Sequence, residues 1–320
     1  MPSVKLYSYD VPGGNFGDDL NHLIWDALLP GWRVWAPEVT LVGVGTLLGE
    51  GGPPPGRKLV LGSGTGYGAL PDVSDEAEWD MRAVRGPLTA MRLGLPPERA
   101  TVDPAALLPE TDGFRPEDLA AFGGGAPGEV LFVPHHTSVG RFDWEAICAE
   151  AGVGYQTPKD EVRAVVGRLS RARAVVAESM HAAIVADAYG VPWRAVAVTR
   201  GFNRFKWEDW ARSIEMDAPR AGRFFEPLRR AQDAVLALRG RRGSGGGRNG
   251  GAGAREGGEG ALMRRLGPAL RPFAVRRLRA EARGPFALSD RGAAAKACAR
   301  LRAALDAARA DYAPPGGTGA

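Results

Sequence analysis

The sequence has few of the residues that crosslink small proteins or bind metals: its 320 residues include two cysteines and four histidines. Cys148 and Cys298 lie far apart, and Cys298 falls in an alanine-rich segment with a helical pattern. A disulfide framework or a zinc site needs more, and more closely spaced, ligands than this. We therefore expect two free thiols, no structural disulfide and no metal site.

Long apolar runs are also missing. No stretch reaches the roughly 18 uninterrupted apolar residues that a membrane-spanning helix needs. The N-terminal segment MPSVKLYSYDVPGG enters a strand pattern directly, without the charged and then apolar regions of a secretory signal. The sequence therefore predicts a globular, cytoplasmic protein.

Positive charge is scarce over residues 1–238, whose net charge is −7, and is concentrated after them. Residues 239–320 hold 17 Lys and Arg against 6 Asp and Glu, a net charge of +11. These basic residues are not interleaved with aromatic side chains for base stacking, so we expect no nucleic-acid partner. An alternative is peripheral contact with an anionic membrane at its inner face, to which each Lys or Arg adds about 1 kcal/mol.

The body of the chain alternates short apolar runs, glycine-rich loops and helical patterns. The expected strands are VKLYSYD, TLVGVGTLL, KLVLGSGTG, EVLFVPHH, ARAVVAES and WRAVAVT, and the expected helices include residues 18–29, 142–151 and 158–170. Repeated units of this kind predict an α/β fold with parallel sheets and sites at the carboxyl ends of the strands. We expect two Rossmann-like domains, residues 1–115 and 125–238, facing one another across a ligand-binding cleft.

The C-terminal region divides into two segments. Residues 240–260 are glycine-rich and predict a disordered, flexible linker. Residues 261–320 predict a tail of basic helices, interrupted early by Pro268 and Pro272 and resumed after a Ser-Asp cap signal. We expect these helices to pack on the second domain, with attraction to a membrane surface as a secondary role.

The segment AVVAESMHAAIVADAYGVP holds the strongest candidate for chemistry. Its β-branched apolar run ends at Glu178 and Ser179, and a helical pattern begins near His181. Amide groups at the start of a helix carry positive partial charge, and imidazole titrates near neutral pH, so this junction suits an anionic substrate. The alternative is that His181 only caps or packs the helix.

The loop GGNFGDDLN joins the first expected strand to the first helix. Gly14 and Gly17 permit close approach of a ligand, with Asn15 beside them as a further contact. A cap accounts for one of Asp18 and Asp19. The other carboxylate is then a candidate general base, or a contact for a sugar hydroxyl.

Cationic candidates come from two further segments. Arg85 precedes Gly86 and Pro87 at a turn, where its guanidinium suits a carboxylate or phosphate; the alternative is an interdomain salt bridge. Asp103 precedes a proline and is expected to form a turn. The segment FNRFKWEDW offers Asn203 and Lys206 as a sugar or cationic contact, with its tryptophans expected to pack.

Taken in order, NFGDDLN, VGVGTLL, LGSGTGYG, VRGP with the following DPA, and ESMHAAIVADAYGVP resemble the polysaccharide pyruvyl transferase family over roughly residues 1–215. The resemblance implies a GT-B-like pair of Rossmann-type domains. It also implies transfer of a pyruvyl group from phosphoenolpyruvate to sugar hydroxyls as a cyclic ketal, with no cofactor beyond that donor. The acceptor class it implies is a lipid-linked oligosaccharide of exopolysaccharide or cell-surface polysaccharide synthesis.

The resemblance matches His181 to the motif histidine and Arg85 to an arginine suited to the anionic donor. Many members carry arginine two residues before the histidine, where this chain has Ser179. Arg85, Lys206 or Arg204 would then supply the missing charge.

We expect His181, Asp18 and Asp19 to be catalytic, with His181 as the acid and one aspartate acting on the acceptor hydroxyl. The residues expected to bind substrate are Gly14, Asn15, Gly17, Ser63, Gly64, Arg85, His135, His136, Glu178, Ser179, Asn203 and Lys206. Two alternatives stay open. One is a GT-B glycosyltransferase that uses a nucleotide sugar; the other, favoured by Ser179, is a non-catalytic assembly factor of polysaccharide synthesis.

Overall fold

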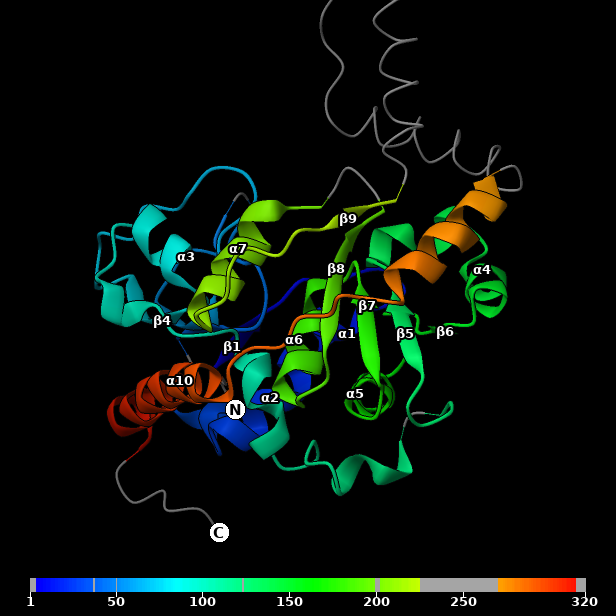
Figure 1. Ribbon diagram of the computed structural model, residues 1–320. Helices are drawn as coiled ribbons and strands as arrows, with labels where there is room; N and C mark the ends of the chain where they lie inside the picture. Colours follow the sequence, from blue (N-terminus) through cyan, green and yellow to red (C-terminus); the bar gives the residue numbers. More distant parts are fainter. Residues whose placement is uncertain are drawn as a thin grey trace, which may run out of the picture.

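The computed structural model describes residues 4–36, 38–49, 51–122, 124–198, 202–224 and 270–314. Two parallel β-sheets with surrounding helices form the described structure (Figure 1). The first sheet has the order β1-β2-β3-β4, and the second has the order β6-β5-β7-β8-β9. All registered strand pairs are parallel, so the predicted α/β class with parallel sheets is confirmed.

The strands of the first sheet are β1 (Lys5–Tyr7), β2 (Thr40–Val42), β3 (Lys58–Ser63) and β4 (Trp79–Val84). The strands of the second sheet are β5 (Val130–Val133), β6 (Gly154–Tyr155), β7 (Ala174–Ala177), β8 (Trp193–Ala197) and β9 (Gly222–Arg223). The α-helices are α1 (Phe16–Asp19), α2 (Asn21–Leu28), α3 (Pro87–Arg92), α4 (Trp144–Ala151), α5 (Val162–Ser170), α6 (Met180–Ala188), α7 (Arg204–Ser213) and α10 (Arg291–Tyr312). Short 3₁₀-helices are η1 (Trp32–Val34), η2 (Pro97–Arg99), η3 (Pro104–Glu110), η4 (Asp118–Ala121) and η5 (His136–Arg141).

Local caps explain where the predicted helices begin. Asp143 accepts a hydrogen bond from the amide of Ala146, so α4 starts at residue 144 instead of 142. Glu161 accepts one from Ala164, so α5 starts at residue 162 instead of 158. The helix expected at 18–29 is instead two consecutive helices, α1 and α2, joined at Leu20.

The largest hydrophobic core joins the two sheets. It contains Leu41 and Leu59 of the first sheet, Val175 of the second, and most of α6 between them. Every residue of α6 except Ala188 is buried, as expected for a helix that is apolar on all sides. The site residues carried by α6 therefore rest on a rigid element.

The helix covering residues 270–281 packs on the second sheet as predicted. Its side chains Leu270, Ala274, Val275 and Leu278 share a core with Phe132 and Val176. The helix lies beside α4 in Figure 1. It continues through Pro272, so the prediction that this proline interrupts the helix is wrong. The packing of this helix on the second sheet offsets the backbone hydrogen bond that Pro272 cannot donate.

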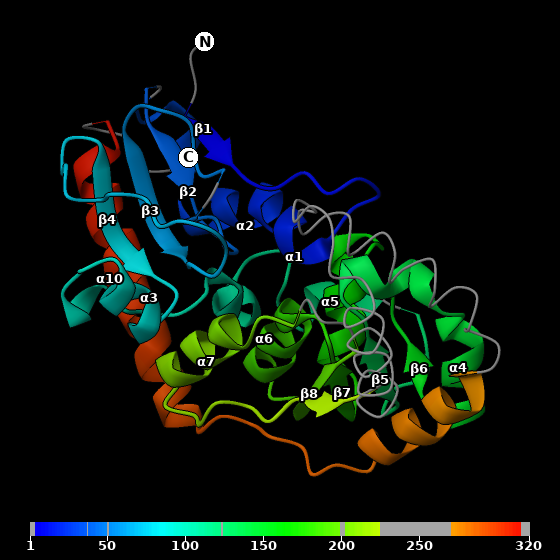
Figure 2. The ribbon, with the colours of Figure 1, turned by 90° about the horizontal axis from the view of Figure 1, so that it is seen from above.

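The last helix, α10, corrects the prediction that the whole basic tail packs on the second domain. It lies chiefly against β3, β4 and η3, and Figure 2 shows it beside β4. Its buried stripe joins the large core through Ala297, Leu301, Leu305 and Ala308. The hydroxyl of Tyr312 donates to Asp80 at 2.8 Å and accepts from Arg57 at 3.0 Å, which anchors the helix end on the first sheet.

Both cysteines are buried free thiols, as predicted, and burial raises the pKa of Cys148 to about 12. Within the described ranges, no helix combines the length and apolarity needed to cross a bilayer. The predicted flexible linker at 240–260 lies outside the described residues, as do residues 261–269 of the predicted tail.

Candidate functional site

A cavity of about 510 Å³ lies at the carboxyl ends of the strands of both sheets. Its walls come from the segments that follow β1, β2, β3, β5, β7 and β8. The predicted site residues that line it are Asn15, Asp18, His135, His136, Glu178, Ser179, His181, Asn203 and Lys206. It also takes in side chains that the sequence did not single out, among them Tyr9, Thr46 and Tyr67.

His181 is the second residue of α6, directly after the β7 strand, as its sequence setting predicts. Ser179 is the N-cap, and its hydroxyl accepts from the amide of Ala182 at 3.4 Å. The imidazole packs against α1, where a Cβ added to Gly17 would lie 2.1 Å from Nδ1. Gly17 therefore does not line the cavity; its missing side chain leaves room for the ring.

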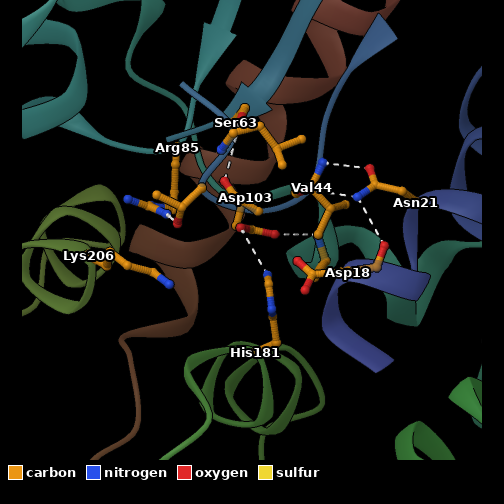
Figure 3. Close-up of polar contacts among 12 residues, drawn as sticks. Asp18, Asn21, Val44, Ser63, Arg85, Asp103, His181 and Lys206 are labelled. Carbon is orange, nitrogen blue, oxygen red and sulfur yellow. Dashed lines mark hydrogen bonds and ion pairs between the residues drawn. The ribbon is translucent and has the colours of Figure 1, made fainter. Parts of the chain in front are cut away.

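Asp103 faces His181 from the first half of the chain (Figure 3). The distance between His181 Nε2 and Asp103 Oδ2 is 3.7 Å, and the Asp103 side chain is fully buried. Its other oxygen, Oδ1, accepts from the amide of Ala105 at the start of η3, which is the turn role predicted from the sequence. The position facing His181 was missed, because no local pattern links two residues so far apart in the chain.

The two adjacent aspartates of the first loop have different surroundings. Asp19 Oδ2 accepts from the backbone amide of Asn15 at 3.0 Å, which secures the start of α1. Burial raises the pKa of Asp19. Asp18 lines the cavity, and its Oδ2 accepts from the side-chain amide of Asn15 at 2.6 Å. Asp18 is thus the carboxylate available to a ligand, while Asp19 and Gly14, whose φ of 82° shapes the preceding turn, do not line the cavity.

Arg85 does not line the cavity. Its guanidinium is fully buried and paired with Asp209 of α7, with 3.1 Å between Nε and Oδ2. It also donates to the hydroxyl of Thr46 at 2.8 Å and to the carbonyl of Thr65 at 2.9 Å. A Cβ added to Gly64 would lie 2.3 Å from the guanidinium carbon. The salt-bridge alternative therefore describes Arg85, and Gly64 makes room for it.

Ser63 and Glu178 hold loops together. The Ser63 hydroxyl lies within the first half, between the carbonyl of Gly45 and the amide of Leu47, and does not line the cavity. Glu178 Oε2 accepts from the amide of His135 at 3.0 Å, and Oε1 accepts from Val198 at 3.1 Å. Glu178 therefore ties the ends of three neighbouring strands to each other at the cavity wall.

Lys206 is the one Lys or Arg among the described residues that line the cavity. Its Nζ donates to the hydroxyl of Tyr67 at 3.2 Å and lies 4.9 Å from the centre of that ring. Burial, with the charge of Arg85 next in importance, lowers the pKa of Lys206 to about 8. Asn203 caps α7 and donates to the carbonyl of Gly66 at 2.6 Å, so it positions the helix start against the first half. Arg204 is exposed and lies outside the cavity lining.

His135 and His136 are adjacent in the cavity wall, with their ring centres 4.2 Å apart. His135 Nδ1 lies 2.8 Å from the Thr137 hydroxyl. Burial lowers the pKa of His135 to about 3, and burial also lowers the pKa of His136. Both rings are therefore neutral at pH 7 and add no positive charge toward an anion.

This arrangement defines an α/β protein with an imidazole, a carboxylate and an ammonium group in one cavity. Residues 75–200 match the profile of the polysaccharide pyruvyl transferase family, so the resemblance seen in the sequence is confirmed. The chain is also similar to the succinoglycan biosynthesis protein ExoV of Rhizobium meliloti (strain 1021), with 46% identity over 215 residues. That similarity covers 66% of this chain and 65% of the relative, so the chain spans slightly less than two thirds of the relative's length.

Proposed function

We propose that the protein transfers the pyruvyl group of phosphoenolpyruvate to two hydroxyls of one sugar, forming a cyclic ketal during exopolysaccharide synthesis. The observation that carries the proposal is the convergence of His181, Asp18 and Lys206 on one cavity in a chain that matches the profile of this family. The relative's role in succinoglycan biosynthesis supports the polysaccharide context.

The residues of the cavity suit the demands of this chemistry. Phosphoenolpyruvate carries a carboxylate and a phosphate, which the Lys206 ammonium and the first amides of α6 would hold. His181 would protonate the methylene carbon while a sugar hydroxyl adds to the neighbouring carbon, and Asp18 would take the hydroxyl proton. A second hydroxyl of the sugar then displaces phosphate and closes the ketal, and its proton goes to the departing phosphate.

We extend the proposal to the architecture and the partners. The cavity lining from both sheets supports a GT-B-like pair of Rossmann-like units, with bounds near 1–115 and 125–238. We also propose a lipid-linked oligosaccharide as acceptor, reached at the inner face of the membrane with the help of the basic tail. No cofactor beyond the donor is part of the proposed reaction.

Thermal stabilisation tests the donor directly. A ligand that binds only the folded state raises the melting temperature according to its concentration over its Kd. We expect phosphoenolpyruvate to stabilise the wild type, and a panel of nucleotide sugars to leave its melting temperature unchanged. The shift should disappear in Lys206→Gln and persist in Arg204→Gln, which removes an exposed charge from the same helix. Stabilisation by a nucleotide sugar alone would instead identify a glycosyltransferase. Binding without turnover of any acceptor would favour the assembly factor.

Binding of phosphoenolpyruvate should weaken as the pH rises through about 8, the value to which burial lowers the pKa of Lys206. A phosphate monoester loses its second proton near pH 6, so the charge of the donor is constant in this range. If only the ammonium form binds, the Kd rises about tenfold between pH 7 and pH 9.

Calorimetric titrations across this pH range measure that effect. Lys206→Arg is the matched variant, because guanidinium stays protonated and its binding should not follow the same curve. A wild-type Kd that is flat from pH 7 to pH 9 would exclude Lys206 as the titrating contact.

The outer part of the cavity is suited to the acceptor sugar. Tyr9 and Tyr67 line it with 36% and 45% of their surfaces exposed, and aromatic rings pack well against the apolar faces of sugars. We expect Tyr9→Ala to raise the KM for the acceptor about five- to tenfold, and to leave the Kd of phosphoenolpyruvate within twofold. Tyr9→Phe keeps the ring and should stay near wild type. If Tyr9→Ala and Tyr9→Phe changed the KM for the acceptor equally, the Tyr9 ring would not be the group that packs against the sugar.

A further inference from the structure

Two buried polar atoms face each other at the base of the cavity. His181 Nε2 and Asp103 Oδ2 are 3.7 Å apart, and neither atom has a hydrogen-bond partner among the described residues (Figure 3). The distance exceeds the usual 2.7–3.2 Å of a hydrogen bond that nitrogen donates to oxygen. Burying such groups unpaired costs free energy, so their apposition needs an explanation beyond folding.

The turn role of Asp103 does not explain its charge. Oδ1 alone caps η3 by accepting from the amide of Ala105, and asparagine or serine would cap equally well. The fold nevertheless brings the second oxygen to the histidine. Gly62, with φ of 89°, lets β3 approach the segment closely, since a Cβ there would lie 2.5 Å from Pro104. Gly62 thus makes room for the segment that carries Asp103, and Gly17 makes room for the imidazole of His181.

We propose that Asp103 is a positioning residue for His181. Its Oδ2 accepts a hydrogen bond from Nε2–H, fixes the plane of the ring and stabilises the imidazolium form in a site sheltered from water. Because Asp103 holds Nε2–H in this proposal, proton exchange with a bound substrate is assigned to Nδ1, the ring nitrogen on the side of α1. The catalytic consequence of this assignment rests on the proposed function. The contact between Asp103 and His181 does not depend on that function.

The catalytic test uses Asp103→Asn, which keeps the size and the cap but removes the negative charge. We expect kcat to fall by about 10²- to 10⁴-fold, with the Kd of phosphoenolpyruvate unchanged within twofold. In a His181→Gln background the same substitution should change the residual turnover less than threefold, because Asp103 acts through His181. The matched control is Asp143→Asn, the cap of α4 outside the cavity, which should leave kcat at the wild-type value.

Two outcomes would overturn the proposal. One is a kcat for Asp103→Asn within threefold of wild type. The other is an equal fold loss of kcat on Asp103→Asn in the wild-type and His181→Gln backgrounds. A double-mutant cycle on unfolding, with the same four proteins, tests the contact without any substrate. We expect the single substitutions to be non-additive by at least threefold in the unfolding equilibrium constant. If the effects of the two single substitutions on the free energy of unfolding were strictly additive, the contact between Asp103 and His181 would be excluded. A wild type that does not turn over phosphoenolpyruvate would reject the proposed function alone.

Discussion

Replacing Arg85 with alanine will lower the free energy of unfolding by about 3–5 kcal/mol, because it leaves the Asp209 carboxylate in the interior without its counter-ion. Both side chains have no exposed surface, so water cannot replace the lost partner. Thr89 still donates to Asp209 through its amide and its hydroxyl, but neither carries a charge. Urea denaturation at constant pH measures the loss.

The comparison variant for Arg85→Ala is Arg212→Ala, which breaks a half-exposed pair with Glu208 on α7. Exposed pairs of this kind contribute about 0.3–0.5 kcal/mol, so this variant should be nearly as stable as the wild type. The double variant Arg85→Ala with Asp209→Ala should lose less than the sum of the single losses, since both remove one interaction. If Arg85→Ala kept wild-type stability but no longer bound phosphoenolpyruvate, the arginine would be a donor ligand after all.

Elements with a clear local pattern could be predicted from the sequence. The apolar runs before Glu178 and His135 mark β7 and β5, and the helical pattern that begins near His181 marks α6. β4 was missed because Asp80 and Arg82 interrupt its apolar pattern. Both side chains form ion pairs or hydrogen bonds with residues near the end of α10, so the strand is covered by a helix more than 200 residues further along the chain.

For the candidate site, too, only part of the arrangement could be predicted from the sequence. His181 and Lys206 could be expected near each other because they follow parallel strands of one sheet, and Asp18 could be expected opposite them across the predicted cleft. The pairings that decide the roles of the site residues could not be predicted from the sequence. Arg85 with Asp209 is a contact between residues 124 positions apart, and no local pattern distinguishes it from a ligand site. The pairing of His181 with Asp103 likewise depends on how the two halves pack.

His181→Gln should reduce kcat by about 10²- to 10⁴-fold, the usual contribution of a positioned acid or base. Glutamine is similar in size and polarity but cannot deliver a proton to the methylene carbon of the donor. The free energy of unfolding should change by no more than about 1 kcal/mol, because glutamine suits a helix interior. Initial rates with phosphoenolpyruvate and an acceptor oligosaccharide measure the effect, beside a denaturation curve for each variant.

The control for His181→Gln is His22→Gln, which alters an exposed ring on α2 outside the cavity lining and should keep wild-type kcat.

The affinity for phosphoenolpyruvate decides between two explanations for a loss of kcat in His181→Gln. A Kd for phosphoenolpyruvate within threefold of wild type places the missing interaction in the transition state, as expected for an acid. A large rise in Kd with a matching fall in kcat/KM would make His181 a donor contact. Turnover near the wild-type rate would mean that the proton comes from elsewhere. His135 and His136 would not be the source at neutral pH, because burial lowers the pKa of both rings.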